Sequence, residues 1–221
     1  VVGMNRTTPE ATNIVWRPGI PKNRLETSPL KLNNMSKVAK PFSLLLLGLV
    51  FLGCGKSEKS AIEEAIRLEL KKPEGELTQA DFQELKELSI YRVGRPVKDI
   101  TLVGELTNLE QLEFAGGDIS DPAPLAKLTK LRSLQIYGCG IKDFSALTDM
   151  TSLEELMASD NQVSDLSSLK GLTKLRVLTL NGNRIKDTSP LLGLKSLKSL
   201  NLKGNPISQE AIGNLKKALP K

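Results

Sequence analysis

Residues 172–193 read LTKLRVLTLNGNRIKDTSPLLG, with aliphatic side chains at the first, fourth, seventh, ninth and fourteenth positions. The same pattern begins again at residues 106, 128, 150 and 194, so units of 22 residues follow one another along the chain. A fixed period of this length indicates a solenoid, in which each unit makes one coil and packs on its neighbours. Aromatic residues are only 4% of the chain, so we expect an aliphatic core.

Within each unit the seventh and ninth residues alternate with outward positions, as in a β-strand. We expect both side chains to point inward and to stack on the next coil about 4.8 Å away, so that the strands form a parallel sheet along a concave wall. The seventh positions are Leu112, Leu134, Leu156, Leu178 and Leu200, and the ninth are Phe114, Ile136, Ala158, Leu180 and Leu202.

This periodicity is the leucine-rich repeat pattern, which covers residues 82–207 when a less regular first unit is included. In that first unit Val97 and Asp99 come two residues late, which predicts a two-residue insertion within Arg92 to Pro96. The units resemble those of internalin-type bacterial leucine-rich repeat proteins. The resemblance implies a helical N-terminal cap, 3₁₀ turns on the convex face, secretion and protein binding by the concave face. We therefore predict an α/β fold, a right-handed solenoid of six coils.

Both ends of such a stack need a cover. Ser60 to Lys72 has the spacing of an amphipathic helix ended by Pro73, and Thr78 can begin a second short helix, so residues 60–81 are the predicted N-terminal cap. Ser208 can N-cap a closing helix within residues 208–221, with Ile212 and Leu215 turned inward.

The twelfth position of the unit carries polar side chains that we expect to bind the backbone of adjacent coils. Gly117 interrupts this column and predicts a locally weaker coil. We interpret Cys139, which belongs to the column, as a structural thiol, with a reactive thiol as the alternative. The predicted structural ladder is Cys139, Asn161, Asn183 and Asn205.

Aspartates recur at the same period, and they allow two interpretations. Calcium would need oxygen ligands within about 2.5 Å of one ion, whereas these carboxylates would be strung along the convex side. We therefore expect them to cap 3₁₀ turns, and we predict no metal and no cofactor. The aspartates are Asp99, Asp121, Asp143, Asp165 and Asp187.

The composition argues against catalysis and against nucleic-acid binding. The chain has no His and two Cys, which removes Ser-His-Asp and Cys-His nucleophile pairs. Its net charge is +6, but residues 1–53 hold seven cations and two acids, so the repeats are close to neutral and give no footprint for phosphate backbones. Glu113 and Glu155 could form an acid–base pair, but an open wall supplies no enclosed pocket to tune them. We predict no enzyme.

Residues 35–53 have the pattern of a signal peptide, with a basic start and an uncharged run that is too short to span a bilayer. The end of this run, FLGC at 51–54, resembles the lipobox of bacterial lipoproteins, although Phe51 replaces the usual Leu. The resemblance implies a lipid on Cys54 and a linker over 54–59. It also implies that the protein is located at the cell envelope, at the outer membrane or cell surface rather than the inner membrane. A buried thiol and a phosphate loop are the alternatives, and Val50 stands where the latter needs Gly.

We leave residues 1–34 out of the fold, as a start assigned too early or a disordered extension.

The sixth, eighth and tenth positions should face outward along the concave wall. Tyr137 and Met157 are candidate anchors, because aromatic and Met side chains with a polar rim favour protein contacts. The predicted function is a monomeric, non-catalytic binding module for a protein or surface glycan, tethered to a membrane through Cys54; the alternative is a spacer lipoprotein without a specific ligand. The candidate ligand-facing residues are Tyr91, Glu113, Gln135, Tyr137, Glu155, Met157, Thr179, Asn181 and Asn201.

Overall fold

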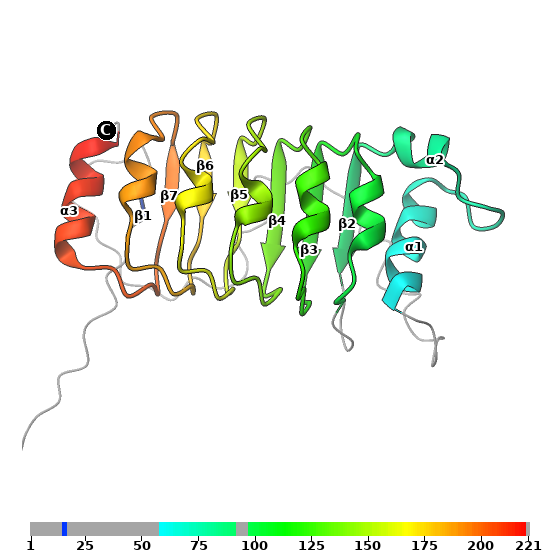
Figure 1. Ribbon diagram of the computed structural model, residues 1–221, viewed down its shortest axis with the longest axis horizontal. Helices are drawn as coiled ribbons and strands as arrows, with labels where there is room; N and C mark the ends of the chain where they lie inside the picture. The colour runs from blue at the N-terminus through cyan, green and yellow to red at the C-terminus, as the bar shows by residue number, and fades with distance from the viewer. Residues whose placement is uncertain (1–14, 17–57, 92–96, 220–221) are drawn as a thin grey trace, which may run out of the picture. The chain divides into compact units, whose positions relative to one another are not determined.

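The computed structural model describes residues 15–16, 58–91 and 97–219, and these form a stack of coils (Figure 1). Each of the first five coils contributes one strand and one 3₁₀ helix, and in the last coil the strand is followed by an α-helix. The strands are β2 (Glu87–Tyr91), β3 (Gln111–Ala115), β4 (Ser133–Tyr137), β5 (Glu155–Met157), β6 (Val177–Thr179) and β7 (Ser199–Asn201). The 3₁₀ helices are η2 (Thr101–Glu105), η3 (Ala123–Lys127), η4 (Ser145–Leu147), η5 (Ser167–Leu169) and η6 (Ser189–Gly193).

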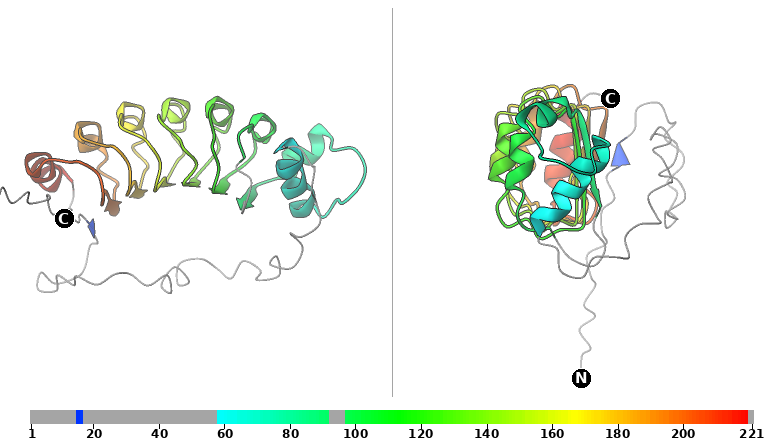
Figure 2. Two further views of the ribbon diagram at one scale, coloured as in Figure 1. Left: turned by 90° about the horizontal axis from the view of Figure 1, so that it is seen from below. Right: turned by 90° about the vertical axis from the view of Figure 1, so that its right-hand side faces the viewer.

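Strands β2 to β7 pair in parallel and in the predicted register. Leu88 pairs with Leu112, and the seventh-position column continues in register to Leu200, with every member 3% exposed or less. Within this stack the strands line the concave side and the 3₁₀ helices the convex side (Figure 2, left). The predicted leucine-rich repeat solenoid is therefore confirmed.

A continuous aliphatic core runs through the coils. The first and fourth positions, such as Leu172 and Leu175, are fully buried, and Phe144 is the only large ring among the most deeply buried side chains. Burying one such side chain stabilises a fold by about 1.5 to 3 kcal/mol, so the stability of each coil depends on its neighbours. The interior is filled by this packing, which leaves the outer surfaces for contacts with other molecules.

The N-terminal end of the stack is covered by α1 (Glu58–Glu69), which packs on β2 and η2 and buries Ile62 and Ile66. The helix ends three residues before the expected Lys72, because the chain turns there and Lys71 has a φ of +53°. The short helix α2 (Gln79–Glu84) follows, and its N-cap Thr78 forms a capping box with Asp81.

The other end is covered by α3 (Gln209–Ala218), which packs on η6. The hydroxyl oxygen of Ser208 accepts a hydrogen bond from the N–H of Ala211 at 3.2 Å, as an N-cap does. Ile212 and Leu215 are buried, and Leu219 packs on the core while partly exposed.

The recurring aspartates begin the convex turns. Each carboxylate accepts the backbone N–H two residues later, as Asp165 does from Ser167 at 2.8 Å and Asp121 from Ala123 at 2.9 Å. The N-cap residue is the one between them, so the aspartates lie one position earlier than a standard N-cap and form Asx-turns. Among the described residues no group of three or more acidic or Cys side chains could hold a metal ion.

One strand was not expected. β1 (Val15–Trp16) pairs antiparallel with β7, Val15 with Asn201 and Trp16 with Leu200, although it belongs to the segment that we left out of the fold. The segment has no apolar period, so only backbone pairing with an open sheet edge could place a strand there. The proposed signal peptide, Cys54 and the insertion within 92–96 lie outside the described residues. No helix in the described ranges is long and apolar enough to cross a membrane.

Candidate functional site

The outward side chains of β2 to β7 form one surface, which we call the strand wall. Parallel pairing places equivalent positions of neighbouring strands side by side, so Glu113 lies beside Gln135, and Gln135 beside Met157. Tyr91 lies beside Ala115, and Ala115 beside Tyr137. Six coils thus bring side chains that are distant in sequence onto a single face.

The nine predicted ligand-facing residues all lie on the strand wall or at its edge, but they differ in exposure. Tyr91 is 60% exposed, and the others are half-buried. Ser159 occupies the same row as Tyr137 yet is only 6% exposed, because its hydroxyl donates to Asn181 Oδ1 at 2.8 Å. That position is therefore unavailable to a ligand.

The two predicted anchors touch each other. The Tyr137 hydroxyl lies 2.9 Å from Met157 Sδ and donates toward Gln135 Oε1 at 3.1 Å. Burial, followed by the nearby carboxylates of Glu113 and Glu155, raises the pKa of Tyr137 to about 12. The phenol therefore stays neutral and serves as a hydrogen-bonding and stacking group.

Tyr91 lies near the same carboxylate from the other side. Burial, followed by a hydrogen bond with Glu113, raises the pKa of Tyr91 to about 12, and Ser89 opposes this shift by bonding the oxygen. Glu113 thus acts on both tyrosines. The structure brings together Tyr91, Glu113, Gln135, Tyr137 and Met157 on β2 to β5.

Three further candidates, on β6, just after β6 and on β7, offer fewer free polar groups. Asn181 Oδ1 accepts the bond from Ser159, and Asn201 Oδ1 accepts from the backbone N–H of Lys203 at 3.1 Å. Thr179 pairs with Asn201 in the sheet register. The strand wall is therefore asymmetric, with its aromatic and acidic side chains on the first four strands.

A row of alternating charges precedes the strands, and we did not predict it. Lys86 lies 3.7 Å from Glu110, and Glu154 lies between Arg132 at 2.6 Å and Arg176 at 3.6 Å. Arg132 holds the pKa of Glu154 below its usual value by a hydrogen bond. The signal was present, because the fifth position of successive units alternates in sign from Lys86 to Arg176, although Lys198 does not continue the alternation. Lys86, Arg132 and Arg176 form their ion pairs with Glu110 and Glu154 of this row, and not with the acidic side chains of the strand wall.

The polar ladder lies inside the coils and bonds the backbone of neighbouring coils. Asn161 Oδ1 accepts from the N–H groups of Cys139 and Ile141 at 3.1 Å, and its Nδ2 donates to Ile136 O and Ser159 O at 2.8 and 3.1 Å.

Asn183 and Asn205 form similar bonds in the next two coils. Asn183 Oδ1 accepts from the N–H of Val163 and Asn205 Oδ1 from the N–H of Ile185, both at 3.0 Å. At Gly117 a Cβ would lie 3.2 Å from the carbonyl oxygen of Val97, so the gap in the ladder coincides with a close approach of two coils.

Cys139 is fully buried in this ladder, with its Sγ 3.3 Å from the carbonyl oxygen of Tyr137. Burial raises the pKa of its thiol to about 11. Nucleophilic chemistry requires the thiolate, which is scarce at neutral pH under these conditions. This environment is that of a structural thiol.

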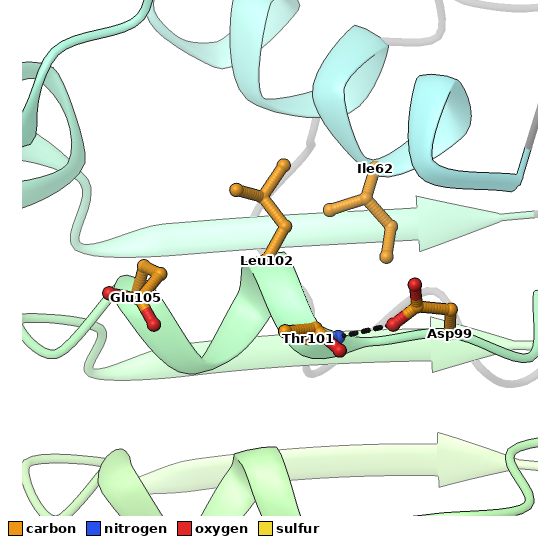
Figure 3. A pocket seen from close by; sticks show the side chains of 5 residues that line it. All are labelled: Ile62, Asp99, Thr101, Leu102 and Glu105. Atoms are coloured by element: carbon orange, nitrogen blue, oxygen red, sulfur yellow. Dashed lines mark hydrogen bonds between the residues drawn. The ribbon is translucent and has the colours of Figure 1, made fainter.

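A shallow hollow lies between α1 and η2 and is lined by Ile62, Asp99, Thr101, Leu102 and Glu105 (Figure 3). Its volume of about 260 Å³ is below the range of roughly 300 to 1,000 Å³ typical of small-molecule sites. Asp99 begins a convex turn here by accepting from Thr101 N–H at 2.9 Å. The hollow therefore offers less than the strand wall does as a place for a ligand.

Residues 129–217 match the family model described as "Leucine Rich repeats (2 copies)", in three overlapping segments, 129–171, 151–191 and 173–217. A search of the curated proteins finds no match. Among solved structures, the chain is similar to an internalin (inlF) of Listeria monocytogenes, with 30% identity and a TM-score of 0.54 over 77% of this chain. The chain spans only 58% of that internalin's length.

Two further structures share the fold at lower identity. Internalin C2 of Listeria monocytogenes is 22% identical with a TM-score of 0.56, over 73% of this chain and 85% of that one. A leucine-rich repeat protein of Leptospira interrogans is 24% identical with a TM-score of 0.56, over 64% of this chain and 38% of that one. The chain thus carries leucine-rich repeats and is similar in structure to Listeria internalins, and leucine-rich repeat domains are typically protein-binding modules.

Proposed function

We propose that this protein is a non-catalytic binding module, whose strand wall contacts a partner protein and which a lipid on Cys54 holds at the bacterial cell envelope. One observation carries the binding function. The in-register strands place Tyr91, Glu113, Tyr137 and Met157 on one continuous outward face, while the interior of the solenoid is filled.

The chemistry of this face favours a protein partner. Tyrosine and methionine are enriched in the centres of protein interfaces, where a large side chain is ordered at small entropic cost. The half-buried Tyr137 is already held by its contacts with Gln135 and Met157, so little further ordering is needed on binding. Polar side chains of the neighbouring strands supply a rim.

The binding function can be tested with envelope extract and the purified chain. The variant Tyr137→Ala with Met157→Ala should lose saturable capture of a partner, because it removes the two anchors. The matched control, Val177→Ala with Ser199→Ala, changes two outward residues of the same wall on β6 and β7 and should keep it. Capture that is equal in both variants, or no saturable partner at all, would favour a spacer lipoprotein.

The anchor is supported by the sequence pattern at Cys54 and has a structural consequence. Cleavage before Cys54 would remove residues 1–53, and β1 with them, so the edge of β7 would lose its antiparallel strand. The mature protein would then present an open sheet edge.

Two measurements test the anchor. Cys54→Ser should move the protein from the membrane fraction to the soluble fraction, and mass spectrometry should find a mature N-terminus at Cys54 with added lipid mass. Continued membrane attachment of Cys54→Ser, or a mature chain that still contains residues 15–16, would contradict it.

A further inference from the structure

The row of tenth positions contains a gap between two aromatic rings. Tyr91, Ala115 and Tyr137 lie side by side on β2, β3 and β4. Neighbouring strands are about 4.8 Å apart, so the two tyrosines begin from backbones about 9.6 Å apart. Only Ala115, whose side chain is a methyl group, lies between them in the register, and we call this small residue flanked by two rings the slot.

Both tyrosine rings lean in the same direction along their strands. The Tyr91 hydroxyl interacts with Glu113 and Ser89, and the Tyr137 hydroxyl with Gln135 and Met157. All four partners belong to the eighth-position row, so both rings extend from the tenth row toward the eighth. The rings therefore flank β3 on its two sides.

The side chain on β3 at the end of this slot is the carboxylate of Glu113. Among the described residues no Lys or Arg lies within 4.0 Å of it as an ion-pair partner, and the cations nearest in the register, Lys86 and Arg132, belong to the paired row before the strands. A carboxylate has about four acceptor positions, so its bond with Tyr91 leaves others open. The slot thus places one carboxylate beside two aromatic side chains.

We propose that this slot, formed by Tyr91, Glu113, Ala115 and Tyr137, receives an arginine side chain from an extended segment of the partner protein. The inference rests on the proposed function, since it names the chemistry that the strand wall recognises. A guanidinium is planar and stacks on aromatic faces, and its N–H groups match a carboxylate in two places. One carboxylate is too few for a divalent cation, which requires several oxygen ligands.

The probe is a short extended peptide with one central arginine, titrated against the full chain, with a second peptide in which citrulline replaces the arginine. Citrulline keeps the planar shape and loses the charge. The arginine peptide should bind saturably and the citrulline peptide about tenfold more weakly. Binding of the arginine peptide should weaken with added salt, as expected for an exposed charge pair.

Three variants locate the binding on the slot. Tyr91→Ala and Glu113→Gln should each weaken the binding of the arginine peptide about tenfold. Ala115→Leu places a larger side chain between the two rings, so the arginine and citrulline peptides should then bind this variant equally. Val177→Ala, on β6 of the same wall, is the matched control and should bind as the unchanged chain does. Unchanged thermal unfolding shows that each variant is folded.

Equal binding of the two peptides, or an unchanged affinity in Glu113→Gln, would overturn the proposal. Free arginine that binds as tightly as the peptide would also overturn it, because the occupant would then be a small cation. If the slot variants have no effect while Tyr137→Ala with Met157→Ala still loses the envelope partner, the slot is wrong and the binding wall stands. If every wall variant captures the partner equally, the proposed function itself fails.

Discussion

Replacing Asn161 by alanine should remove the strongest single tie between two central coils. The amide accepts from the N–H groups of Cys139 and Ile141 and donates to the carbonyls of Ile136 and Ser159. The side chain is 6% exposed, so water cannot replace these bonds without opening the interior. The variant would take this partner from two N–H donors and from the carbonyl of Ile136, whereas the carbonyl of Ser159 keeps its bond from the N–H of Gly138.

The expected loss follows from counting these bonds. One hydrogen bond contributes about 1 kcal/mol to stability, and an unsatisfied buried group costs about as much or more, so four lost bonds predict about 4 kcal/mol. Asn205→Ala is the matched control, because that amide has three hydrogen-bond partners and lies on the partly exposed last rung, where water can reach the freed groups. Its loss should be about 1 to 2 kcal/mol.

Urea unfolding followed by circular dichroism gives both values. Because a solenoid is stabilised by contacts between neighbouring coils, Asn161→Ala should also broaden the transition or split it in two, as the halves on either side uncouple. Equal losses for Asn161→Ala and Asn205→Ala, or a loss below about 1 kcal/mol for Asn161→Ala, would refute the role that we assign to the ladder.

Three shorter predictions concern single residues. Gly182→Ala should lower the free energy of urea unfolding by about 1 to 2 kcal/mol, because φ is +68° and a Cβ would collide with the carboxylate of Asp160. Gly171→Ala, with open space around it, should leave stability unchanged, and equal effects of the two substitutions would contradict this reasoning. With the other cysteine replaced by serine, the Cys139 thiol, whose pKa is about 11, should react with a thiol reagent at pH 8 only after unfolding, and rapid native labelling would indicate a reactive thiol. The pKa of Asp81 is lowered to about 2, first by the hydrogen bond from Lys72, so its stabilisation of the N-terminal cap is present above about pH 4 and lost as pH falls toward 2. Hydrogen exchange of the α2 amides should become faster as pH falls through that range, and no change in protection would contradict the role of this bond.

Much of the fold follows from the sequence, because one period fixes many residues together. Once Leu178 and Leu180 are assigned to a strand, every equivalent pair shares that assignment, and the structure places the seventh-position column in register. The aspartates could also be assigned to the convex turns, although not to the position before the cap. A repeat therefore reveals inward and outward positions without any tertiary information.

Features that depend on side-chain direction or on non-repeating contacts could not be predicted. The row assignment gives Tyr91 and Tyr137 as outward residues, but only their hydroxyl partners show that both rings lean along the strands and enclose Ala115. The pairing of β1 with β7 joins segments about 185 residues apart through backbone groups, which carry no sequence pattern. The charge row follows the same 22-residue period and could therefore have been predicted. The apolar pattern that identifies the repeat does not include its charged members.

The face that meets the partner can be mapped in cells with a photo-crosslinking amino acid placed at one position at a time. Gln111 is exposed on β3 of the strand wall, and Ala126 is exposed on η3 at the convex side. We expect a crosslinked envelope protein from position 111 and none from position 126. Crosslinks from position 126 alone, or from neither position, would contradict the assignment of the strand wall as the binding surface.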